Sequence, residues 1–284
     1  MTLLVFGKTG QVATELARLA PEAVFLGRAQ ADQTDPAACV AQIAAHAPAA
    51  VINAAAWTAV DRAEEQEAEA TRINGATPAA LAAECAARDI PFVHISTDYV
   101  FPGDGETPWK TTDPVAPPNA YGRSKLAGED GVRAAGGRFA VLRTSWVFSA
   151  HGGNFVKTML RLSETRDALS VVGDQIGGPT PAADIAQACL TIADVLKTRP
   201  ETAGTYHFSG APDVSWAGFA RETFALSGRA VTVTDIPTAD YPTPATRPLN
   251  SRMDCSATEA AFGVARPDWR AGLRAVLAEL GALR

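Results

Sequence analysis

The segment that decides the fold is Leu3-Leu4-Val5-Phe6-Gly7-Lys8-Thr9-Gly10-Gln11-Val12-Ala13. Its four leading residues are all apolar, which is typical of a strand buried on both faces of a parallel sheet. The glycines then permit a tight turn and let a phosphate approach the backbone, while the following helix offers its free N–H groups. The pattern therefore predicts a dinucleotide-binding turn, with a plain strand–helix turn as the alternative.

The chain to residue 148 repeats this alternation of apolar strands and helices. We expect strands over 24–26, 51–54, 91–96 and 139–143, and helices over 11–20, 36–46, 61–88 and 119–135. Asp35 and Pro36 are an N-cap and a first-turn proline, and breaks are expected near Gly75 and Pro78. This order predicts an α/β, Rossmann-type doubly wound parallel sheet. The proline- and glycine-rich segment 101–118 should be a long functional loop.

The later chain is less regular and predicts a second, smaller α/β domain that binds the substrate. Helices are expected over 154–166, 181–197, 215–227 and 270–280, and strands over 205–208 and 231–236. We assign 1–148 and roughly 169–210 to the cofactor domain. The substrate domain then takes 149–168 and roughly 211–284.

Composition excludes several classes of protein. The 284 residues carry a net charge of −6, and no basic block is present to bind a nucleic-acid polymer. No apolar segment is long enough to span a membrane, and no signal-peptide pattern opens the sequence. The four cysteines form no Cys-x-x-Cys pair, which favours a reduced, cytoplasmic setting.

Arg28 follows the second predicted strand, where an acidic residue would bind a ribose 2′-hydroxyl. A guanidinium there can pair instead with a 2′-phosphate. The sequence thus predicts NADPH as cofactor, with NADH as the alternative. The other role for Arg28 is that of a solvated surface residue.

Tyr121 and Lys125 are four residues apart on a predicted helix, so they share one face. A nearby ammonium should lower the pKa of the tyrosine and make it a useful acid at neutral pH. Thr97 ends the fourth strand, at the edge where parallel sheets bind ligands, and can hydrogen-bond a carbonyl oxygen. The three residues together predict a carbonyl-reducing catalytic site.

Several longer motifs strengthen this interpretation. They are FGKTGQV (6–12), NAAAWTAVDRAE (53–64), STDYVFPG (96–103), YGRSKLAGE (121–129), RTSWVF (143–148), GNFVKTMLRL (153–162), DQIGGPT (174–180) and RPLNSRMD (247–254). With them the chain resembles the extended short-chain dehydrogenase/reductases over nearly its whole length. The resemblance implies an oxidoreductase that completes dTDP-rhamnose synthesis by reducing the 4-keto group of dTDP-4-dehydro-L-rhamnose with NADPH.

The same resemblance implies a role for each matching residue. Tyr121 would donate the proton, Lys125 would activate Tyr121, and the Thr97 hydroxyl would tune the acidity of Tyr121. The cofactor would contact Gly7, Gly10, Gln11, Val12, Arg28, Asp32, Gln33, Ala55, Ala56, Thr58, Tyr121 and Lys125. The dTDP-sugar substrate would contact Thr97, Asp98, Trp146, Asn154, Arg247 and Asn250.

Metal binding and assembly are less well specified. Glu15 lies where some family members hold a divalent metal between subunits, but Ala182 and Ala183 stand where a second glutamate would be expected. His46, His94, His151 and His207 show no ligand spacing, so we expect structural histidines, no metal in the chemistry, and a monomer or homodimer.

Two other functions fit the same motifs. One is a different nucleotide-sugar ketoreductase or an epimerase on the same scaffold. The other is a regulatory subunit that binds NADP without turnover, against which the intact Thr97–Tyr121–Lys125 set argues.

Overall fold

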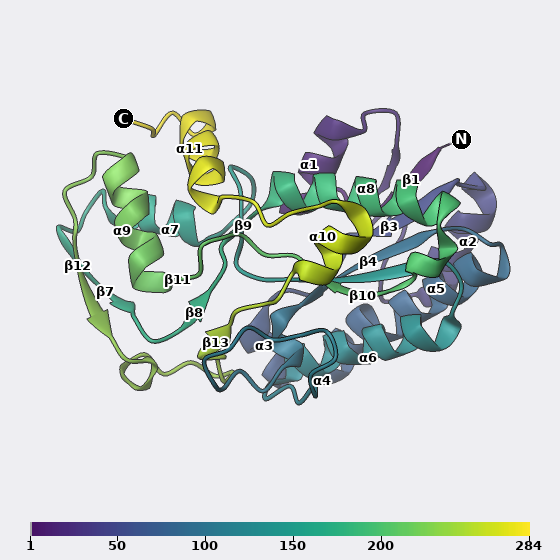
Figure 1. Cartoon of the computed structure of the whole chain (residues 1–284), viewed down its shortest axis with the longest axis horizontal. Helices are drawn as coiled ribbons and strands as arrows, with labels where there is room; N and C mark the ends of the chain where they lie inside the picture. The colour runs from purple at the N-terminus through teal and green to yellow at the C-terminus, as the bar shows by residue number, and fades with distance from the viewer. Residues whose placement is uncertain (1) are drawn as a thin grey trace.

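A computed structural model describes residues 2–284, and a sheet of six parallel strands forms its larger part (Figure 1). Its order is β10-β5-β4-β3-β1-β2. The strands are β1 (Leu3–Phe6), β2 (Val24–Leu26), β3 (Ala50–Asn53), β4 (Phe92–Thr97), β5 (Phe139–Thr144) and β10 (Gly204–His207). Since β1 pairs with both β2 and β3, the chain reverses direction across the sheet at β1. The predicted doubly wound parallel sheet is confirmed, and ligands of such sheets bind at this reversal.

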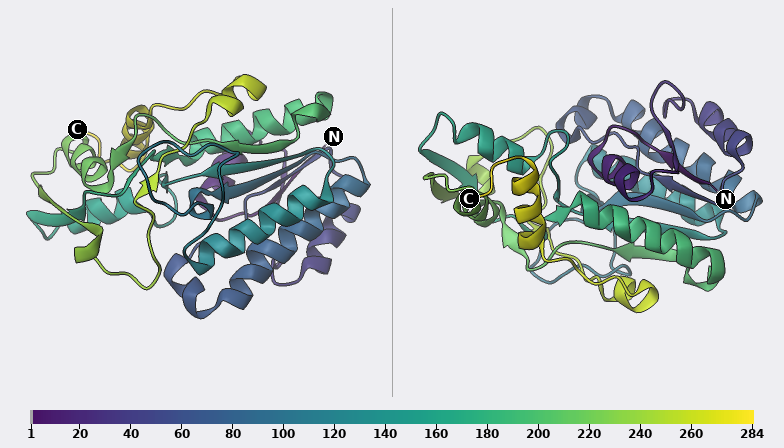
Figure 2. Two further views of the ribbon diagram at one scale, coloured as in Figure 1. Left: turned by 60° about the horizontal axis from the view of Figure 1, so that its bottom comes forward. Right: turned by 90° about the horizontal axis from the view of Figure 1, so that it is seen from above.

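Helices cover both faces of this sheet (Figure 2). One face carries α1 (Gln11–Leu19) and α8 (Ala182–Thr198), and the other carries α2 (Pro36–His46), α5 (Thr77–Ala87) and α6 (Ala120–Ala135). Successive β1 residues alternate between the two cores: Val5 packs with α1 and α8, whereas Leu4 and Phe6 pack with the opposite helices. Each such buried side chain stabilises the fold by about 1.5–3 kcal/mol, which explains why the strand is apolar throughout.

The helical region between β3 and β4 is broken into short pieces. These are α3 (Val60–Glu65), α4 (Glu67–Thr71), a π-helical turn (Arg72–Ala76) and α5. The predicted break near Gly75 corresponds to the π-helical turn. A Cβ at Gly75 would lie 3.1 Å from the Cβ of Ala127, so this turn packs closely on α6. Pro78 stands in the first turn of α5, where a proline needs no hydrogen-bond partner.

The remaining elements form a smaller unit beside the carboxyl edge of the large sheet (Figure 1). Its helices are α7 (Phe155–Leu162), α9 (Trp216–Leu226) and α11 (Trp269–Glu279), and its parallel pair is β7 (Ala168–Val172) with β12 (Thr232–Ile236). Short strands complete it: β6 (Val147–Phe148) with β9 (Thr180–Pro181), and β8 (Ile176–Gly177) between β11 (Val214–Ser215) and β13 (Asn250–Ser251). Phe148, Phe219 and Trp269 are buried in its core.

Two packing relations differ from the predicted segments. Strand β7 was not predicted and pairs with β12, so residues 169–172 lie in the small unit and not with the large sheet. Helix α10 (Ser256–Phe262) was also not predicted, and its Phe262 packs into the core of the large sheet.

One predicted helix is shorter than expected: the helix expected over 154–166 ends at Leu162. Within residues 2–284, no helix combines the length and apolarity needed to cross a membrane.

Candidate active site

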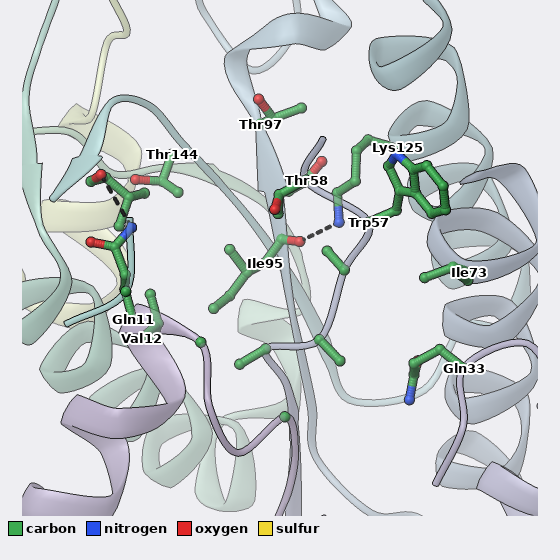
Figure 3. Close-up of a pocket in the computed structure, with 18 of the residues that line it drawn as sticks. Gln11, Val12, Gln33, Trp57, Thr58, Ile73, Ile95, Thr97, Lys125 and Thr144 are labelled. Carbon is green, nitrogen blue, oxygen red and sulfur yellow. Dashed lines mark hydrogen bonds between the residues drawn. The ribbon is translucent and has the colours of Figure 1, made fainter. Parts of the chain in front are cut away.

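A cleft of about 890 Å³ lies at the carboxyl ends of β1, β3 and β4, where Figure 3 shows side chains from several elements facing one space. The structure brings all the predicted cofactor residues to its lining. These are Gly7, Gly10, Gln11, Val12, Arg28, Asp32, Gln33, Ala55, Ala56, Thr58, Tyr121 and Lys125. Their roles stay predictions, but their common location agrees with one extended ligand.

The glycine turn has the geometry that an anion site needs. Gly7 has a φ of +117°, and a Cβ there would lie 3.2 Å from the backbone carbon of Ala54. Gly10 is the N-cap of α1, and a Cβ there would have no neighbour within 4 Å. The first turn of α1 is therefore open to a phosphate, with unpaired N–H groups and the positive end of the helix dipole.

Arg28 and Asp32 lie beyond β2 at one end of the cleft. Arg28 Nε is 3.1 Å from Asp32 Oδ2, and the arginine side chain is 78% exposed. Hydrogen bonds from the backbone and hydroxyl of Thr34, then from Arg28, lower the pKa of Asp32. One edge of the guanidinium thus stays free for a phosphate.

Three buried oxygen atoms of the cleft residues have no hydrogen-bond partner in the described chain. They are Gln33 Oε1, Asp98 Oδ2 and Thr144 Oγ1. Buried polar atoms are almost always paired, since an unpaired one costs about 1–3 kcal/mol. Their clustering along one cleft indicates that a polar ligand completes them.

Lys125 is almost fully buried and reaches from α6 toward β4. Its Nζ donates to the carbonyl oxygen of Ile95 at 2.7 Å, as Figure 3 shows, and lies 3.3 Å from Nε2 of His94. Burial lowers the pKa of Lys125 to about 8. Burial and the Lys125 charge hold the pKa of His94 well below its usual range, so His94 is neutral. We expected His94 to be merely structural, but it contacts the predicted catalytic lysine.

Tyr121 differs from the sequence expectation in its acidity. Burial raises its pKa to about 12, whereas we expected Lys125 to lower it. The ammonium is held by the Ile95 carbonyl, and the hydroxyl of Thr97 provides the main opposing effect on the tyrosine. Tyr121 is therefore protonated at neutral pH, as a proton donor must be.

Thr97 links the tyrosine to a buried carboxyl group. Its Oγ1 donates to Asp98 Oδ1 at 3.1 Å and accepts from the backbone N–H of Tyr99 at 3.2 Å. Burial raises the pKa of Asp98 to about 6. The hydroxyls and the carboxyl thus form one polar group at the end of β4.

Close packing of α6 places Tyr121 and Lys125. Asn119 caps the helix by accepting from the backbone N–H of Gly122 at 2.7 Å. A Cβ at Gly122 would lie 2.2 Å from the carbonyl oxygen of Tyr99, so only glycine fits there. Glycine at this position brings the Tyr121 turn directly against the segment that carries Thr97.

A buried ion pair fixes the same face of this helix one turn further on. Glu129 receives hydrogen bonds from Arg143 at 2.6 and 2.9 Å and from Ser96 at 2.6 Å. Burial opposes the charge of Glu129, but Arg143, Ser96 and Arg133 together lower its pKa. α6 is thereby joined to β4 and β5, the strands beside the site.

The predicted substrate residues divide into two groups. Thr97, Asp98 and Trp146 line the cleft, but Asn154, Arg247 and Asn250 do not. The amide of Asn154 caps α7 and donates to Gln11 Oε1, and that of Asn250 bonds the carbonyls of Asp104 and Thr107.

Arg247 bonds Asp61 at 2.7 Å, while its buried Nη1 has no partner among the described residues. Asn250 thus holds loop carbonyls, and Asn154 holds both its own helix and the cleft residue Gln11. The contacts predicted for all three with the substrate stay predictions.

Sequence reasoning missed several cleft residues. They are Lys8, Thr9, Ile73, Tyr99, Ser145, Gly152, Gly153 and Trp216, among others. Lys8 and Thr9 stand inside the quoted turn, so the signal was present. Trp216 had no such signal, because it comes from α9 in the small unit.

Glu15 belongs to a charged cluster that the sequence did not reveal. It lies 3.0 Å from His151 Nε2, and Arg18 bonds Glu279 at 2.8 Å. The ligand atoms of Glu15, His151 and Glu279 lie within 4.8 Å of one another. His151 therefore has carboxylate neighbours despite its lack of sequence spacing. His151 is thus the partner of the Glu15 carboxylate, and Arg18 is the partner of the Glu279 carboxylate.

The sheet, the glycine turn and the Tyr121–Lys125 helix define the class of nicotinamide-nucleotide-dependent reductases with a short-chain dehydrogenase/reductase fold. Residues 1–282 match the family model described as RmlD substrate binding domain. The dTDP-4-dehydrorhamnose reductase of Sinorhizobium fredii is 43% identical over 283 residues, covering 96% of each chain. The chain belongs to this reductase family.

Solved structures agree with this assignment. The dTDP-4-dehydrorhamnose reductase of Clostridium acetobutylicum has a TM-score of 0.93 and 36% identity, covering 99% of this chain and 100% of its own. That of Bacillus anthracis, solved in complex with NADP, has a TM-score of 0.90 and 33% identity over 98% and 100%. The resemblance and fold inferred from the motifs are confirmed.

Proposed function

We propose that the chain reduces the 4-keto group of dTDP-4-dehydro-L-rhamnose with NADPH and releases dTDP-L-rhamnose. The observation that carries the proposal is the convergence of Thr97, Tyr121 and Lys125 on the cleft that also contains the glycine turn. Family membership and the NADP complex of the Bacillus relative support the choice of substrate and cofactor.

The cleft residues fit a dinucleotide. The open first turn of α1 suits the pyrophosphate, and the exposed edge of Arg28 suits a 2′-phosphate. The unpaired Gln33 Oε1 can accept from an adenine amino group. When bound, NADPH supplies the hydride for the carbonyl carbon.

The protein's own groups then supply the proton and the electrostatics. Tyr121, protonated because burial raises its pKa to about 12, donates its proton to the carbonyl oxygen. Thr97 orients this hydroxyl. The Lys125 ammonium, held by the Ile95 carbonyl, stabilises the negative charge that develops during transfer.

The sugar nucleotide would occupy the part of the cleft near Asp98 and Trp146. Asp98 Oδ2 has no hydrogen-bond partner among the described residues and can accept from a sugar hydroxyl. We include in the proposal a cytoplasmic enzyme that acts as a monomer or homodimer.

The test is NADPH oxidation on addition of dTDP-4-dehydro-L-rhamnose, followed by identification of dTDP-L-rhamnose by mass spectrometry and NMR. Stoichiometric oxidation with this product supports the proposal. An epimerase would keep its cofactor bound and consume no added NADPH. A regulatory subunit would bind NADP tightly without turnover, and either result would overturn the proposal.

A further inference from the structure

The indole rings of Trp146 and Trp216 are stacked, with ring centroids 3.6 Å apart and planes 11° from parallel. Trp146 follows β5 of the large sheet, whereas Trp216 begins α9 of the small unit. Both rings are half-buried and line the cleft. Large aromatic rings left partly exposed in a cleft, and not withdrawn into a core, are typical of binding surfaces.

Trp146 has a strained backbone. Its φ of +50° is unfavourable for a bulky residue and persists only where the surroundings hold it. Its carbonyl oxygen accepts from the N–H of Thr180 at 3.1 Å, and the preceding Ser145 donates to the carbonyl of Gly178 at 3.1 Å. Such strain concentrates at functional sites, because it directs a side chain where an unstrained turn would not.

The second element that fixes the Trp146 ring is the close approach of β8. A Cβ at Gly177 would lie 3.0 Å from Cε2 of Trp146, which is tighter than most packing contacts, and 2.9 Å from Cβ of Ser251. Gly177 therefore leaves the space that this indole needs.

Trp216 is itself held in place before any ligand arrives. Its Nε1 donates to Oε1 of Gln175 at 3.1 Å, and Nε2 of Gln175 donates to the hydroxyl of Thr238 at 3.1 Å. Phe155 packs against it with ring centroids 4.6 Å apart. Because Gln175 is buried, this chain of contacts fixes the orientation of Trp216.

We propose that Trp216 is a substrate-positioning residue, which backs one face of the Trp146 indole and holds that indole over the cleft as a flat apolar wall for the sugar ring. This inference rests on the proposed function and extends it to a residue outside the family motifs quoted above. Pyranose rings present a face of C–H groups, which packs on aromatic surfaces. Since the wall carries no charge, it contributes to binding of the sugar and not of the diphosphate.

The test uses Trp216→Leu, which keeps apolar volume but removes the flat ring, and Trp216→Phe, which restores a ring. For Trp216→Leu we expect the KM for dTDP-4-dehydro-L-rhamnose to rise roughly three- to tenfold. The Kd for NADPH and the kcat at saturating substrate should stay within about twofold of wild type, and Trp216→Phe should recover most of the loss. The circular-dichroism signal of the stacked indoles should vanish in both variants.

Trp269→Phe is the matched control. Trp269 is a fully buried tryptophan of the same unit, packed on Phe219 away from the cleft lining. This variant should lower the melting temperature without raising the KM. An unchanged KM in Trp216→Leu, or an equal rise in Trp269→Phe, would overturn the inference. Failure of the wild-type protein to oxidise NADPH with this substrate would instead overturn the proposed function.

Discussion

Glu129 and Arg143 form a fully buried ion pair, with the side chains 0% and 2% exposed and Oε2 2.6 Å from Nη2. Glu129 lies on α6, four residues after Lys125, and Arg143 lies on β5. The pair therefore ties the helix that carries the predicted acid and its lysine to the sheet beneath. Arg143 also stacks over the ring of Phe101, which begins the long loop after β4.

Replacing Glu129 with Gln should destabilise the protein by about 3–5 kcal/mol, because Arg143 would keep a buried charge without its partner. The neighbours lower the pKa of Glu129 in the folded protein. The pair's contribution is therefore present above the unfolded pKa of about 4.3 and is lost as the pH falls through the folded value. Urea unfolding from neutral to acid pH measures this, and the variant should lose less stability on acidification than wild type.

The control for this prediction is Glu67→Gln. Glu67 pairs with Arg123 at 2.7 Å, but both side chains are over 40% exposed. Its loss should cost under about 1 kcal/mol, because exposed pairs are screened by water. Equal losses in the two variants would show that burial does not set the strength of the Glu129 pair.

Replacing Tyr121 with Phe should lower kcat by roughly 10²–10⁴ while the Kd for NADPH stays near the wild-type value. The variant removes the proton donor and keeps the ring that packs edge-on against Tyr99. Steady-state kinetics and cofactor titration measure the two effects. Tyr241→Phe, at a surface tyrosine 60% exposed, should leave both unchanged. A Tyr121→Phe enzyme with normal turnover would exclude Tyr121 as the acid.

Replacing Arg28 with Ala should raise the KM for NADPH roughly tenfold and leave the KM for NADH nearly unchanged. Only NADPH carries the 2′-phosphate. Because the Arg28 guanidinium is exposed, water weakens its ion pair with this phosphate relative to a buried one. The ratio of kcat/KM for the two cofactors measures the change. Arg88→Ala, at an arginine on the end of α5 paired with Glu84, is the control and should change neither KM. An equal effect of Arg28→Ala on both cofactors would contradict 2′-phosphate recognition.

Replacing Gly122 with Ala should destabilise the protein by roughly 1–3 kcal/mol and lower kcat, because the new Cβ would displace α6 from the Tyr99 backbone. Gly204→Ala is the steric control, since a Cβ at Gly204 on β10, outside the cleft lining, would make only ordinary contacts of 3.5 Å or more with Tyr206. Thermal unfolding and kcat are measured for both variants. A Gly122→Ala protein as stable and active as wild type would show that the contact does not position the helix.

The sequence predicted the large sheet well because its signals are local. Leu3–Phe6 is uniformly apolar, and Asp35 with Pro36 marks the start of α2 at the residue that the structure shows. Most of the predicted cofactor residues likewise follow strand ends, and parallel strands bring such ends to one edge. In the large sheet, the local residue pattern that predicts each strand and helix therefore agrees with the way these elements pack together.

The small unit was harder to predict, because its elements depend on distant partners. β7 is a strand through pairing with β12, more than fifty residues later, and several others have only two residues. Trp216 lines the cleft through the docking of α9, which no nearby residue specifies. The raised pKa of Tyr121 also depends on burial, which the spacing of Tyr121 and Lys125 does not encode.

The long loop after β4 is secured by a segment near the other end of the chain. Trp109 exchanges backbone hydrogen bonds with Arg252 and Asp254 at 2.9 and 2.8 Å, and Asn250 donates to Gly103 at 2.8 Å. During synthesis these partners leave the ribosome long after β1 to β5. Strands β1 to β5 can therefore pair before these partners are synthesised, but the loop beside Thr97 is fixed only after residues 250–254 have been added.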